Sequence, residues 1–399
     1  MWKTVKLGDV CDFQGGSQPP KKEFVYEEQK GYVRFIQIRD FKSDKNLTYI
    51  PVSNKNRLCR TDDIFIGRYG ASVGQILRGL KGAYNVALMK TIPNEEFISK
   101  GWLFAYLNSS LFQKPLKEVS SRSAQNGFSK DDISSFELPL PPLTEQQRIV
   151  AKLDAAFAEI DRASALTTLK QEEINNFKCS ILNINNKKND FFKSALNDLE
   201  ELKIGDICDL MTGGTPSRKV PEYFDNGEIK WLVSGDINKK EIFDCDGRIT
   251  KEGLNNSSAK FLPENSVLIA LNGQGKTRGT VAMLKTKATC NQSLVSIFPK
   301  SGVNLNTKYL YYFLEGMYDK IRRITGDSGN DRRGLNMRLI RNIKILLPPI
   351  SEQENIISKL EMAINELDIA NRVLGEALKN YKALKAAILA QELQSSEAA

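Results

Sequence analysis

The chain has 399 residues, 41% of them hydrophobic, which is enough apolar material for two ordinary domains with cores of their own. Lysine and arginine (57) outnumber aspartate and glutamate (48), and the net charge of +9 favours an acidic partner such as nucleic acid without proving one. Histidine is absent, which excludes Ser-His and Cys-His catalytic pairs and every metal site that needs an imidazole.

The cysteines and the N-terminus bear on the cellular compartment. The six cysteines are scattered without a C-x-x-C pair, which predicts neither a zinc ribbon nor a disulfide framework and fits a reducing environment. The N-terminal residues begin no apolar signal region, and no apolar run approaches the roughly 20 residues that span a bilayer. We therefore expect a cytoplasmic protein without a membrane span or a bound metal.

The first segment, residues 1–142, consists of short strand-like runs separated by Gly, Pro and Asn. Residues 33–38 alternate polar and apolar side chains, and residues 63–70 have the pattern of a buried strand that runs into a glycine loop. Residues 102–107 supply an apolar helical face. The segment is predicted to be a mixed α/β module.

A long helix is predicted over residues 143–185. Pro141-Pro142 cannot continue a preceding element, and Thr144 with Gln147 three residues later has the spacing of a capping box. Apolar residues then recur in alternating steps of three and four, which keeps one seam facing a partner helix, although several seam positions are polar. The predicted apolar seam residues are Leu153, Phe157, Ile160, Ile174 and Ile181.

The second half of the chain repeats the first after a polar linker, residues 186–200. Residues 5–12 return as residues 202–209, an offset of 205 − 8 = 197, whereas the predicted caps Thr144 and Ser351 differ by 351 − 144 = 207. The middle of the second segment, residues 201–349, has therefore gained about ten residues and shares little identity with the first. Two modules are expected to share a scaffold and to present different loops.

The final helix is predicted over residues 350–394, after Pro348-Pro349, with Ser351 and Glu354 as its capping box. Its predicted apolar seam residues are Leu360, Ile364, Leu367, Leu374, Leu378 and Ile388. The polar seam residues Asn371 and Lys385 match Ser164 and Lys178 at the offset of 207, which suggests that the two long helices pair in a fixed register, with solvent exposure as the alternative. Residues 395–399 are expected to be a disordered tail.

Three enzyme motifs are incomplete. Gly275-Lys276-Thr277 follows an apolar run like a phosphate-binding loop, but the glycine required five residues earlier is Ala270. The double prolines lack the Asn/Asp/Ser and aromatic neighbours of adenine methyltransferases. A faint nuclease-like pattern at Glu228 and Lys230 aligns with a framework strand of the first half.

Two dissimilar α/β modules, each followed by a long helix that opens with Pro-Pro-Leu/Ile-Thr/Ser-Glu-Gln, resemble the specificity subunit of a Type I restriction-modification system. The likeness extends from residue 7 to residue 389. It implies an α+β fold in which residues 1–142 and 201–349 are target recognition domains, and in which the helices 143–185 and 350–394 form an antiparallel coiled-coil spacer with pseudo-twofold symmetry.

The resemblance also implies a non-catalytic subunit that reads a bipartite, asymmetric site in double-stranded DNA. Its partners would be two modification (methyltransferase) subunits and, through the complex, restriction (motor and nuclease) subunits. No cofactor is expected on this chain, since S-adenosylmethionine would belong to the methyltransferase and ATP with Mg to the restriction partner.

Candidate DNA-binding residues lie in and beside the glycine loops, because Arg, Asn and Gln can make paired hydrogen bonds to guanine or adenine edges. For each of them a solvated surface role or a phosphate contact is the alternative, and Asn85 and Asn291 are also candidates for turn residues. The candidates are Arg39, Arg68, Tyr69, Ser72, Asn85, Gln125, Asn126, Asn272, Gln274, Lys276, Thr277, Arg278, Asn291, Gln292, Arg332 and Arg333.

Two other classes of protein stay open from the residues alone. A coiled-coil scaffold without DNA readout would explain the seams and the duplication, but not the divergent polar loops. A nuclease or NTPase would need complete motifs, which the sequence lacks.

Overall fold

The computed structural model describes residues 2–122, 127–184, 199–273, 276–326 and 334–394. The chain divides into two compact units: unit 1 is Met1–Thr167 with Gly375–Ala399, and unit 2 is Thr168–Leu374. Both division points lie within long helices, at positions that match in the repeat because 374 − 167 = 207.

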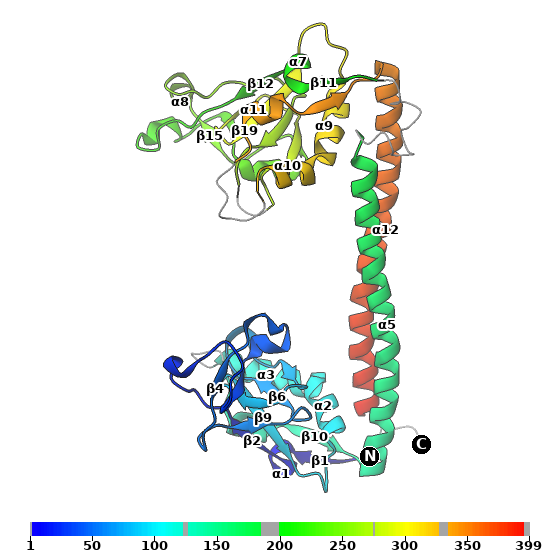
Figure 1. The fold of residues 1–399 in the computed structure, drawn as a ribbon. Coiled ribbons are helices and arrows are strands. Elements are labelled where there is room, and N and C mark those ends of the chain that lie inside the picture. The colour runs from blue at the N-terminus through cyan, green and yellow to red at the C-terminus, as the bar shows by residue number, and fades with distance from the viewer. Residues whose placement is uncertain (1, 123–126, 185–198, 274–275, 327–333, 395–399) are drawn as a thin grey trace. The chain divides into compact units, whose positions relative to one another are not determined.

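The first module, the part of unit 1 that precedes the long helix, consists of short strands and helices (Figure 1). Its strands are β1 (Lys3–Lys6), β2 (Cys11–Gly15), β3 (Tyr32–Ile36), β4 (Tyr49–Pro51), β5 (Leu58–Cys59), β6 (Phe65–Gly67), β7 (Ile76–Leu77), β8 (Gly82–Tyr84), β9 (Leu88–Pro93) and β10 (Glu137–Leu140). Its helices are α1 (Leu7–Val10), α2 (Lys100–Asn108), α3 (Ser110–Arg122) and α4 (Lys130–Ser134), with 3-10 turns η1 (Lys21–Glu23), η2 (Ile38–Phe41), η3 (Asp44–Asn46) and η4 (Gly70–Ser72).

These strands form three small sheets. One has the order β2-β9-β6-β7, all antiparallel, and a second has the order β4-β3-β8-β5, in which β3 and β8 run parallel. The third pairs β1 with β10, and Lys3 faces Leu140. The last pairing brings the start of the chain to the residues that immediately precede the long helix.

The second module, the part of unit 2 that lies before its long C-terminal helix, repeats this frame. Its strands are β11 (Glu201–Lys203), β12 (Cys208–Thr212), β13 (Ile229–Leu232), β14 (Glu241–Ile242), β15 (Arg248–Ile249), β16 (Val267–Ala270), β17 (Val281–Leu284), β18 (Thr289–Cys290), β19 (Leu294–Pro299) and β20 (Lys344–Leu346). Its helices are α7 (Ile204–Ile207), α8 (Lys251–Asn255), α9 (Thr307–Gly316), α10 (Tyr318–Ile324) and α11 (Met337–Arg341), with η5 (Pro221–Tyr223) and η6 (Ser234–Lys239).

The sheet orders of the two modules correspond. β12-β19-β16-β17-β14 matches β2-β9-β6-β7 with the added strand β14, and β15-β13-β18 matches β4-β3-β8. β11 pairs with β20 as β1 pairs with β10. Among the described strands, β14 has no counterpart in the first module and β5 has none in the second, and the other strands keep the same order.

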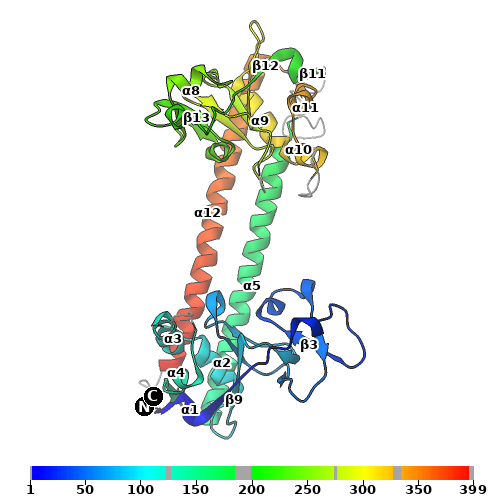
Figure 2. The same cartoon turned by 90° about the vertical axis from the view of Figure 1, so that its left-hand side faces the viewer.

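Two long helices carry the modules, as Figures 1 and 2 show: α5 (Leu143–Leu182) and α12 (Ile350–Gln394). Most of the predicted seam residues are buried or half-buried, and the residues between them are mostly exposed. In unit 1, Lys152 Nζ of α5 lies 2.6 Å from Glu392 Oε1 of α12; in unit 2, Gln171 Nε2 of α5 donates to the carbonyl oxygen of Asn371 of α12 at 3.3 Å. These pairings require antiparallel helices, and the predicted fold class is confirmed.

The predicted capping residues Thr144 and Ser351 lie inside their helices, two residues after the prolines that accept the first helical hydrogen bonds. α5 begins at Leu143 and α12 at Ile350, so that Thr144 and Ser351 lie inside the first turn rather than before it, and Gln147 and Glu354 lie beyond it. The carbonyl oxygen of Pro142 accepts from the N–H groups of Glu145 and Gln146, at 2.9 and 3.0 Å. The second proline of each pair therefore starts the helix earlier than the capping pattern indicates.

The long helices also complete the module cores. In unit 1, Ile149 and Leu153 of α5 and Leu389 and Leu393 of α12 join the cluster around Trp102. In unit 2, Ile356 and Leu360 of α12 and Ile181 and Leu182 of α5 join the equivalent cluster around Tyr309. Each module is thus closed by the first turns of one long helix and the last turns of the other.

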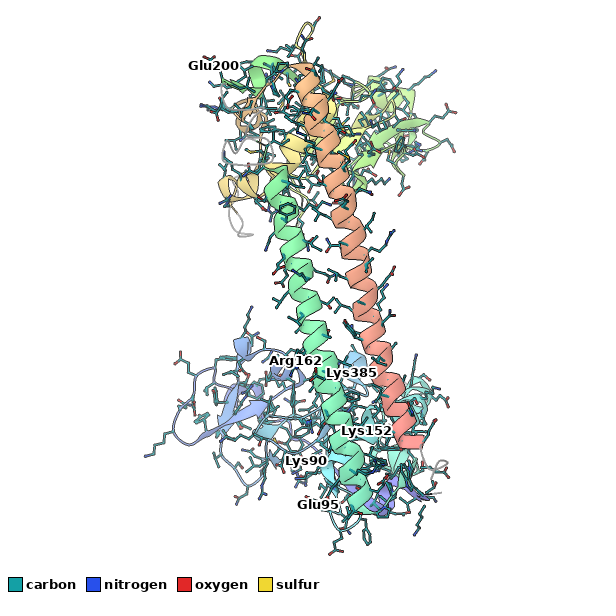
Figure 3. The ribbon with its side chains drawn as sticks, turned by 90° about the vertical axis from the view of Figure 1, so that its right-hand side faces the viewer. Lys90, Glu95, Lys152, Arg162, Glu200 and Lys385 are labelled. Atoms are coloured by element: carbon teal, nitrogen blue, oxygen red, sulfur yellow. The ribbon has the colours of Figure 1, made fainter. Side chains whose placement is uncertain are left out.

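Two ion pairs between the helices are equivalent in the repeat. Lys385 Nζ lies 2.5 Å from Asp161 Oδ1 in unit 1, and Lys178 Nζ lies 2.6 Å from Asp368 Oδ1 in unit 2. Both partners differ by 207 residues (385 − 178 and 368 − 161). The matched lysines at the polar seam positions therefore each pair with an aspartate of the other helix; Figure 3 labels Lys385.

The pair in unit 1 predicts a charge-reversal effect. Lys385→Glu should destabilise the helix pairing in unit 1 by roughly 1 kcal/mol, since the pair is partly exposed and two carboxylates would then face each other. The double variant Lys385→Glu, Asp161→Lys should recover most of this loss in thermal unfolding. Reversal of both charges without recovery would show that the ion pair does not contribute.

Candidate nucleic-acid interface

The glycine loop of the first module connects β6 to β7. Arg68 follows β6, its Nε donates to the carbonyl oxygen of Phe128 at 3.1 Å, and its guanidinium lies 5.0 Å from the centroid of the Tyr69 ring. Tyr69 forms an isolated antiparallel bridge with Gly127 and remains 37% exposed. Ser72 Oγ donates to the carbonyl oxygen of Tyr69 at 2.6 Å. This loop therefore presents the Tyr69 ring beside an arginine whose position is fixed.

The glycine loop of the second module connects β16 to β17 at the equivalent place. Arg278 donates through Nη2 to the carbonyl oxygen of Gly326, and Tyr318 donates its hydroxyl proton to the carbonyl oxygen of Lys276 at 2.7 Å. Thr280 Oγ1 also donates to that Lys276 oxygen at 3.0 Å. The Lys276 backbone is thus held from two sides while its side chain is exposed.

In both modules the glycine loop packs against a loop that comes much later in the sequence. In the first module, Arg68 and Tyr69 contact residues 127–128, just before α4. In the second, Arg278 contacts Gly326. Gly334, just before α11, lies so close to the glycine loop that a Cβ atom added to it would be 3.1 Å from Asn272 Oδ1. Two polar loops therefore converge in each module, and different side chains occupy them.

Arg39 serves its own module. Its Nη2 donates to Thr48 Oγ1 at 3.2 Å and to the Asn46 carbonyl oxygen at 3.4 Å, and its Nε lies 3.7 Å from the Asp40 carboxylate. Burial raises the pKa of Asp40, and the positive charges of Arg34 and Arg39 oppose this rise. A buried carboxylate next to Arg39 gives this arginine a structural partner.

Asn85 and Asn291 occupy equivalent turns. Asn85 Oδ1 accepts from the Ala87 N–H at 2.8 Å, and Asn291 Oδ1 accepts from the Ser293 N–H at 3.0 Å. Asn85 Nδ2 also donates to Gln18 Oε1 at 2.6 Å, and Gln292 Oε1 accepts from Thr215 Oγ1 at 2.6 Å. The turn role that the sequence left open for both asparagines is thus present, and base contact by these residues or Gln292 stays a prediction.

Five candidate residues lie outside the described residues. They are Gln125, Asn126, Gln274, Arg332 and Arg333.

Two glutamines in the repeated motif form an anchor that sequence reasoning missed. Gln146 has no solvent exposure; its Oε1 accepts from the Ser99 N–H at 2.8 Å, and its Nε2 donates to the carbonyl oxygens of Phe97 and Pro141 at 2.8 and 2.9 Å. Gln353 repeats this with the Asn306 N–H and the carbonyl oxygens of Asn304 and Pro348. The available signal was that these glutamines are identical in both copies, whereas the predicted cap partners Gln147 and Glu354 differ.

The described residues contain little that resembles a catalytic or metal site. Burial raises the pKa of all six thiols, to about 12 for Cys11, Cys208 and Cys290, so they are poor nucleophiles. No cluster of three or more Cys, Asp or Glu suited to a metal occurs in the described ranges. None of the helices in those ranges is long and apolar enough to cross a membrane.

Comparison with known proteins identifies this architecture. The chain matches the family model described as the Type I restriction modification DNA specificity domain twice, over residues 1–178 and 197–379. It is 25% identical to the specificity subunit of the Escherichia coli Type I restriction enzyme EcoR124I/EcoR124II over 62% of this chain and 61% of that protein. It is 23% identical to the MjaVIII specificity subunit of Methanocaldococcus jannaschii over 93% and 88%.

A solved structure supports the fold. A chain from work on complex assembly and conformational transition of the type I R-M system aligns with a TM-score of 0.76 and 18% identity over 99% of this chain and 98% of that one. The chain belongs to the Type I restriction-modification DNA specificity family. This confirms the resemblance and the predicted role as a specificity subunit rather than as a catalytic one.

The glutamine anchor predicts a local loss of stability. Gln146→Ala should leave the Ser99 N–H and two carbonyl oxygens buried without partners and destabilise the first module by about 2 kcal/mol or more. Amide hydrogen exchange at the start of α2 should accelerate at least about tenfold. The matched control is Gln147→Ala, which alters an exposed neighbour. Equal exchange rates in the two variants would contradict the anchor.

Proposed function

We propose that the chain reads a bipartite, asymmetric site in double-stranded DNA, one half-site with each module. The observation that supports this most directly is that two polar loops converge in each module on the same frame. The side chains in these loops differ between the two modules. A shared frame gives both modules the same way of meeting the duplex, and different loops give them different base preferences.

Within these loops the anchored arginines and the presented side chains have different roles. Arg68 and Arg278 each donate to a backbone carbonyl oxygen of the neighbouring loop, so they set the shape of the loop. Base contacts are assigned to the presented groups, Tyr69 and Ser72 in the first module and Asn272 and Thr277 in the second, and a phosphate contact is assigned to Lys276. Net positive charge supplies the general attraction to phosphate.

The partners are modification and restriction subunits, and two identical modification subunits bind the duplicated frame. Each unit exposes an equivalent apolar pair on its long helices, which supports two equivalent docking positions. The pairs are Leu166 (59% exposed) with Leu384 (47%) in unit 1, and Val373 (55%) with Phe177 (52%) in unit 2, at the offset of 207. S-adenosylmethionine, ATP and Mg are bound by these partners, and the complex acts on DNA in the cytoplasm.

The second glycine loop predicts separable contributions to DNA binding. Lys276→Ala should weaken binding of the assembled complex to all sequences by a similar factor, because it removes a phosphate contact, and the slope of log affinity against log salt concentration should fall by about one. Asn272→Ala should instead weaken binding to the cognate site by about 1–3 kcal/mol and relax the preference at one base position of the half-site. Selection from random-site duplexes at several salt concentrations measures both effects.

The matched control for the second loop is Lys203→Ala, an exposed lysine on β11, which pairs with β20 and not with the sheet that carries the glycine loop. Its affinity and base preference should equal those of the parent chain. A flat salt response of the parent complex, or a change in both half-sites after Asn272→Ala, would contradict the assignment.

The long helices predict a change in the gap between half-sites. Insertion of seven helix-forming residues after Thr167 and after Leu374, which are equivalent positions, keeps both seams in phase. At 1.5 Å per residue this adds about 10 Å, which corresponds to roughly three base pairs of B-DNA. The methylated sites should keep their bases and gain that gap; altered bases with an unaltered gap would refute the spacer role.

A further inference from the structure

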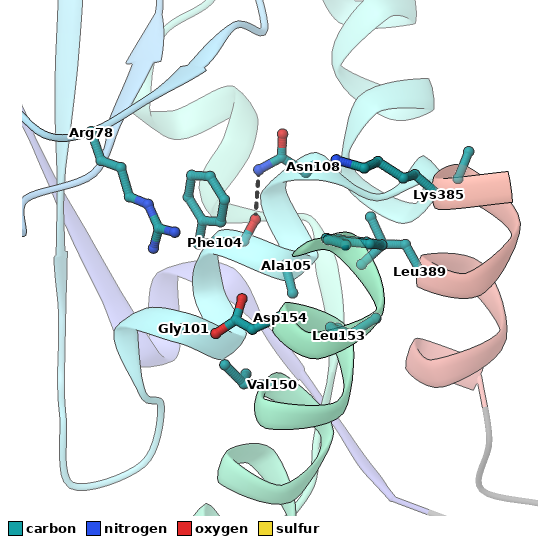
Figure 4. A pocket seen from close by; sticks show the side chains of 12 residues that line it. Arg78, Gly101, Phe104, Ala105, Asn108, Val150, Leu153, Asp154, Lys385 and Leu389 are labelled. Atoms are coloured by element: carbon teal, nitrogen blue, oxygen red, sulfur yellow. Dashed lines mark hydrogen bonds between the residues drawn. The ribbon is translucent and has the colours of Figure 1, made fainter. Parts of the chain in front are cut away.

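Unit 1 contains a hollow of about 360 Å³ between α2 and the adjoining segments of α5 and α12 (Figure 4). Its walls are mainly apolar and include Phe104 and Ala105 of α2, Leu153 of α5 and Leu389 of α12. Gly101 and Ala105 are the small residues on the α2 side. The hollow is an open pocket on the surface of the unit, since Asn108 and Asp154 in its lining are exposed.

The charged residues of this hollow differ in their contacts with other side chains. The Arg78 guanidinium lies 4.0 Å from the centroid of the Phe104 ring, and Lys385 pairs with Asp161 and lies 5.2 Å from the centroid of the Phe157 ring. Asn108 Nδ2 donates to the Phe104 carbonyl oxygen at 2.8 Å, the dashed line in Figure 4. In the part of the chain that the structure describes, no side chain pairs with the Asp154 carboxylate.

Unit 2 carries a larger side chain at the place equivalent to Ala105. α2 and α9 are equivalent in the repeat at the offset of 207. Ser99 and Asn306 both cap their helices, and both donate their N–H groups to an anchor glutamine. Tyr312 therefore takes the place of Ala105, and Glu361 takes the place of Asp154. The Tyr312 hydroxyl donates to Glu361 Oε1 at 3.1 Å.

The remaining hollow of unit 2 is chemically different. It measures about 490 Å³ and is lined by four lysines and three glutamates, and Lys308, at the position of Gly101, forms an ion pair with Glu361. The apolar recess with an unpaired carboxylate therefore belongs to unit 1, and the second copy supplies a template for its occupant: a ring with a hydroxyl group.

We propose that the hollow of unit 1 receives a tyrosine side chain from a partner polypeptide. The ring packs against Phe104, Ala105 and Leu153, and its hydroxyl group donates to the carboxylate of Asp154, as that of Tyr312 does to Glu361. Aromatic rings combine a large apolar contact area with one polar group, which is the combination this recess offers. Because unit 2 already carries Tyr312 at the position of Ala105, such a partner distinguishes the two ends of a duplicated chain.

The test titrates the full-length chain with p-cresol, the tyrosine side chain in isolation, followed by saturation-transfer NMR and calorimetry. One saturable site per chain is expected. Ala105→Tyr should abolish p-cresol binding, because it places a tyrosine ring in the recess at the position that Tyr312 has in unit 2. Asp154→Leu should weaken p-cresol binding at least about tenfold by removing the charged acceptor. Toluene, which lacks the hydroxyl group, should bind more weakly than p-cresol to the parent chain.

The repeat provides a matched control that does not depend on the folding of Ala105→Tyr. Tyr312→Ala should create a second recess with a free Glu361 acceptor, so that the stoichiometry rises from one to two. N-acetyl-tyrosinamide should bind at least as tightly as p-cresol, since the side chain of a polypeptide must enter with its backbone at the mouth of the pocket. Absence of saturable p-cresol binding to the parent chain, binding unchanged in Ala105→Tyr, or exclusion of the tyrosine amide overturns the proposal.

Discussion

The structure depends on one buried amide in each half of the chain. Gln146 and Gln353 link the first turn of a long helix to the residues that lead into α2 or α9, through two hydrogen bonds each. Each glutamine also donates through Nε2 to the carbonyl oxygen of the first proline before its own helix, Pro141 or Pro348, which gives this backbone oxygen a partner. The direction in which each long helix leaves its module is therefore fixed by groups that are costly to leave unpaired.

The same junction joins packing to function. Because Leu389 and Leu393 close the first module core, and Ile181 and Leu182 close the second, neither core is complete without a helix that begins in the other half of the sequence. Apolar side chains at these places contribute on the order of 2 kcal/mol each. The glycine loops that we propose to contact DNA lie outside this frame, where side chains can change without loss of the core. A duplicated chain can thus keep one framework and read two different half-sites.

The features predicted well from the sequence were those with a local period or an internal copy. The seams of α5 and α12 follow from spacings of three and four residues, and the duplication is visible as two offsets. The caps, but not the starts of the long helices, were misassigned, because Thr144 and Ser351 match a capping pattern whereas the carbonyl oxygen of Pro142 already accepts the first helical hydrogen bonds. The pattern contains no information about which residue before it adopts the capping geometry.

The roles of single polar residues could not be predicted because their partners are remote in sequence. Gln146 bonds to residues 47 and 49 positions away, and Asn85 bonds to Gln18, 67 positions away. A polar side chain in a glycine-rich loop has the same local signature whether it meets DNA or its own module. The contrast between Ala105 and Tyr312 is visible in the sequence, but its meaning depends on the carboxylate that the other helix places beside it.

The central claim is that two different modules on one frame specify two different half-sites at a fixed separation. Mapping methylated bases across the genome of cells that carry this chain with its modification partners tests it most directly. The account predicts one asymmetric motif in two parts, with unspecified bases of constant number between them. A continuous motif, a palindromic motif with identical halves, or a gap of variable length would contradict it.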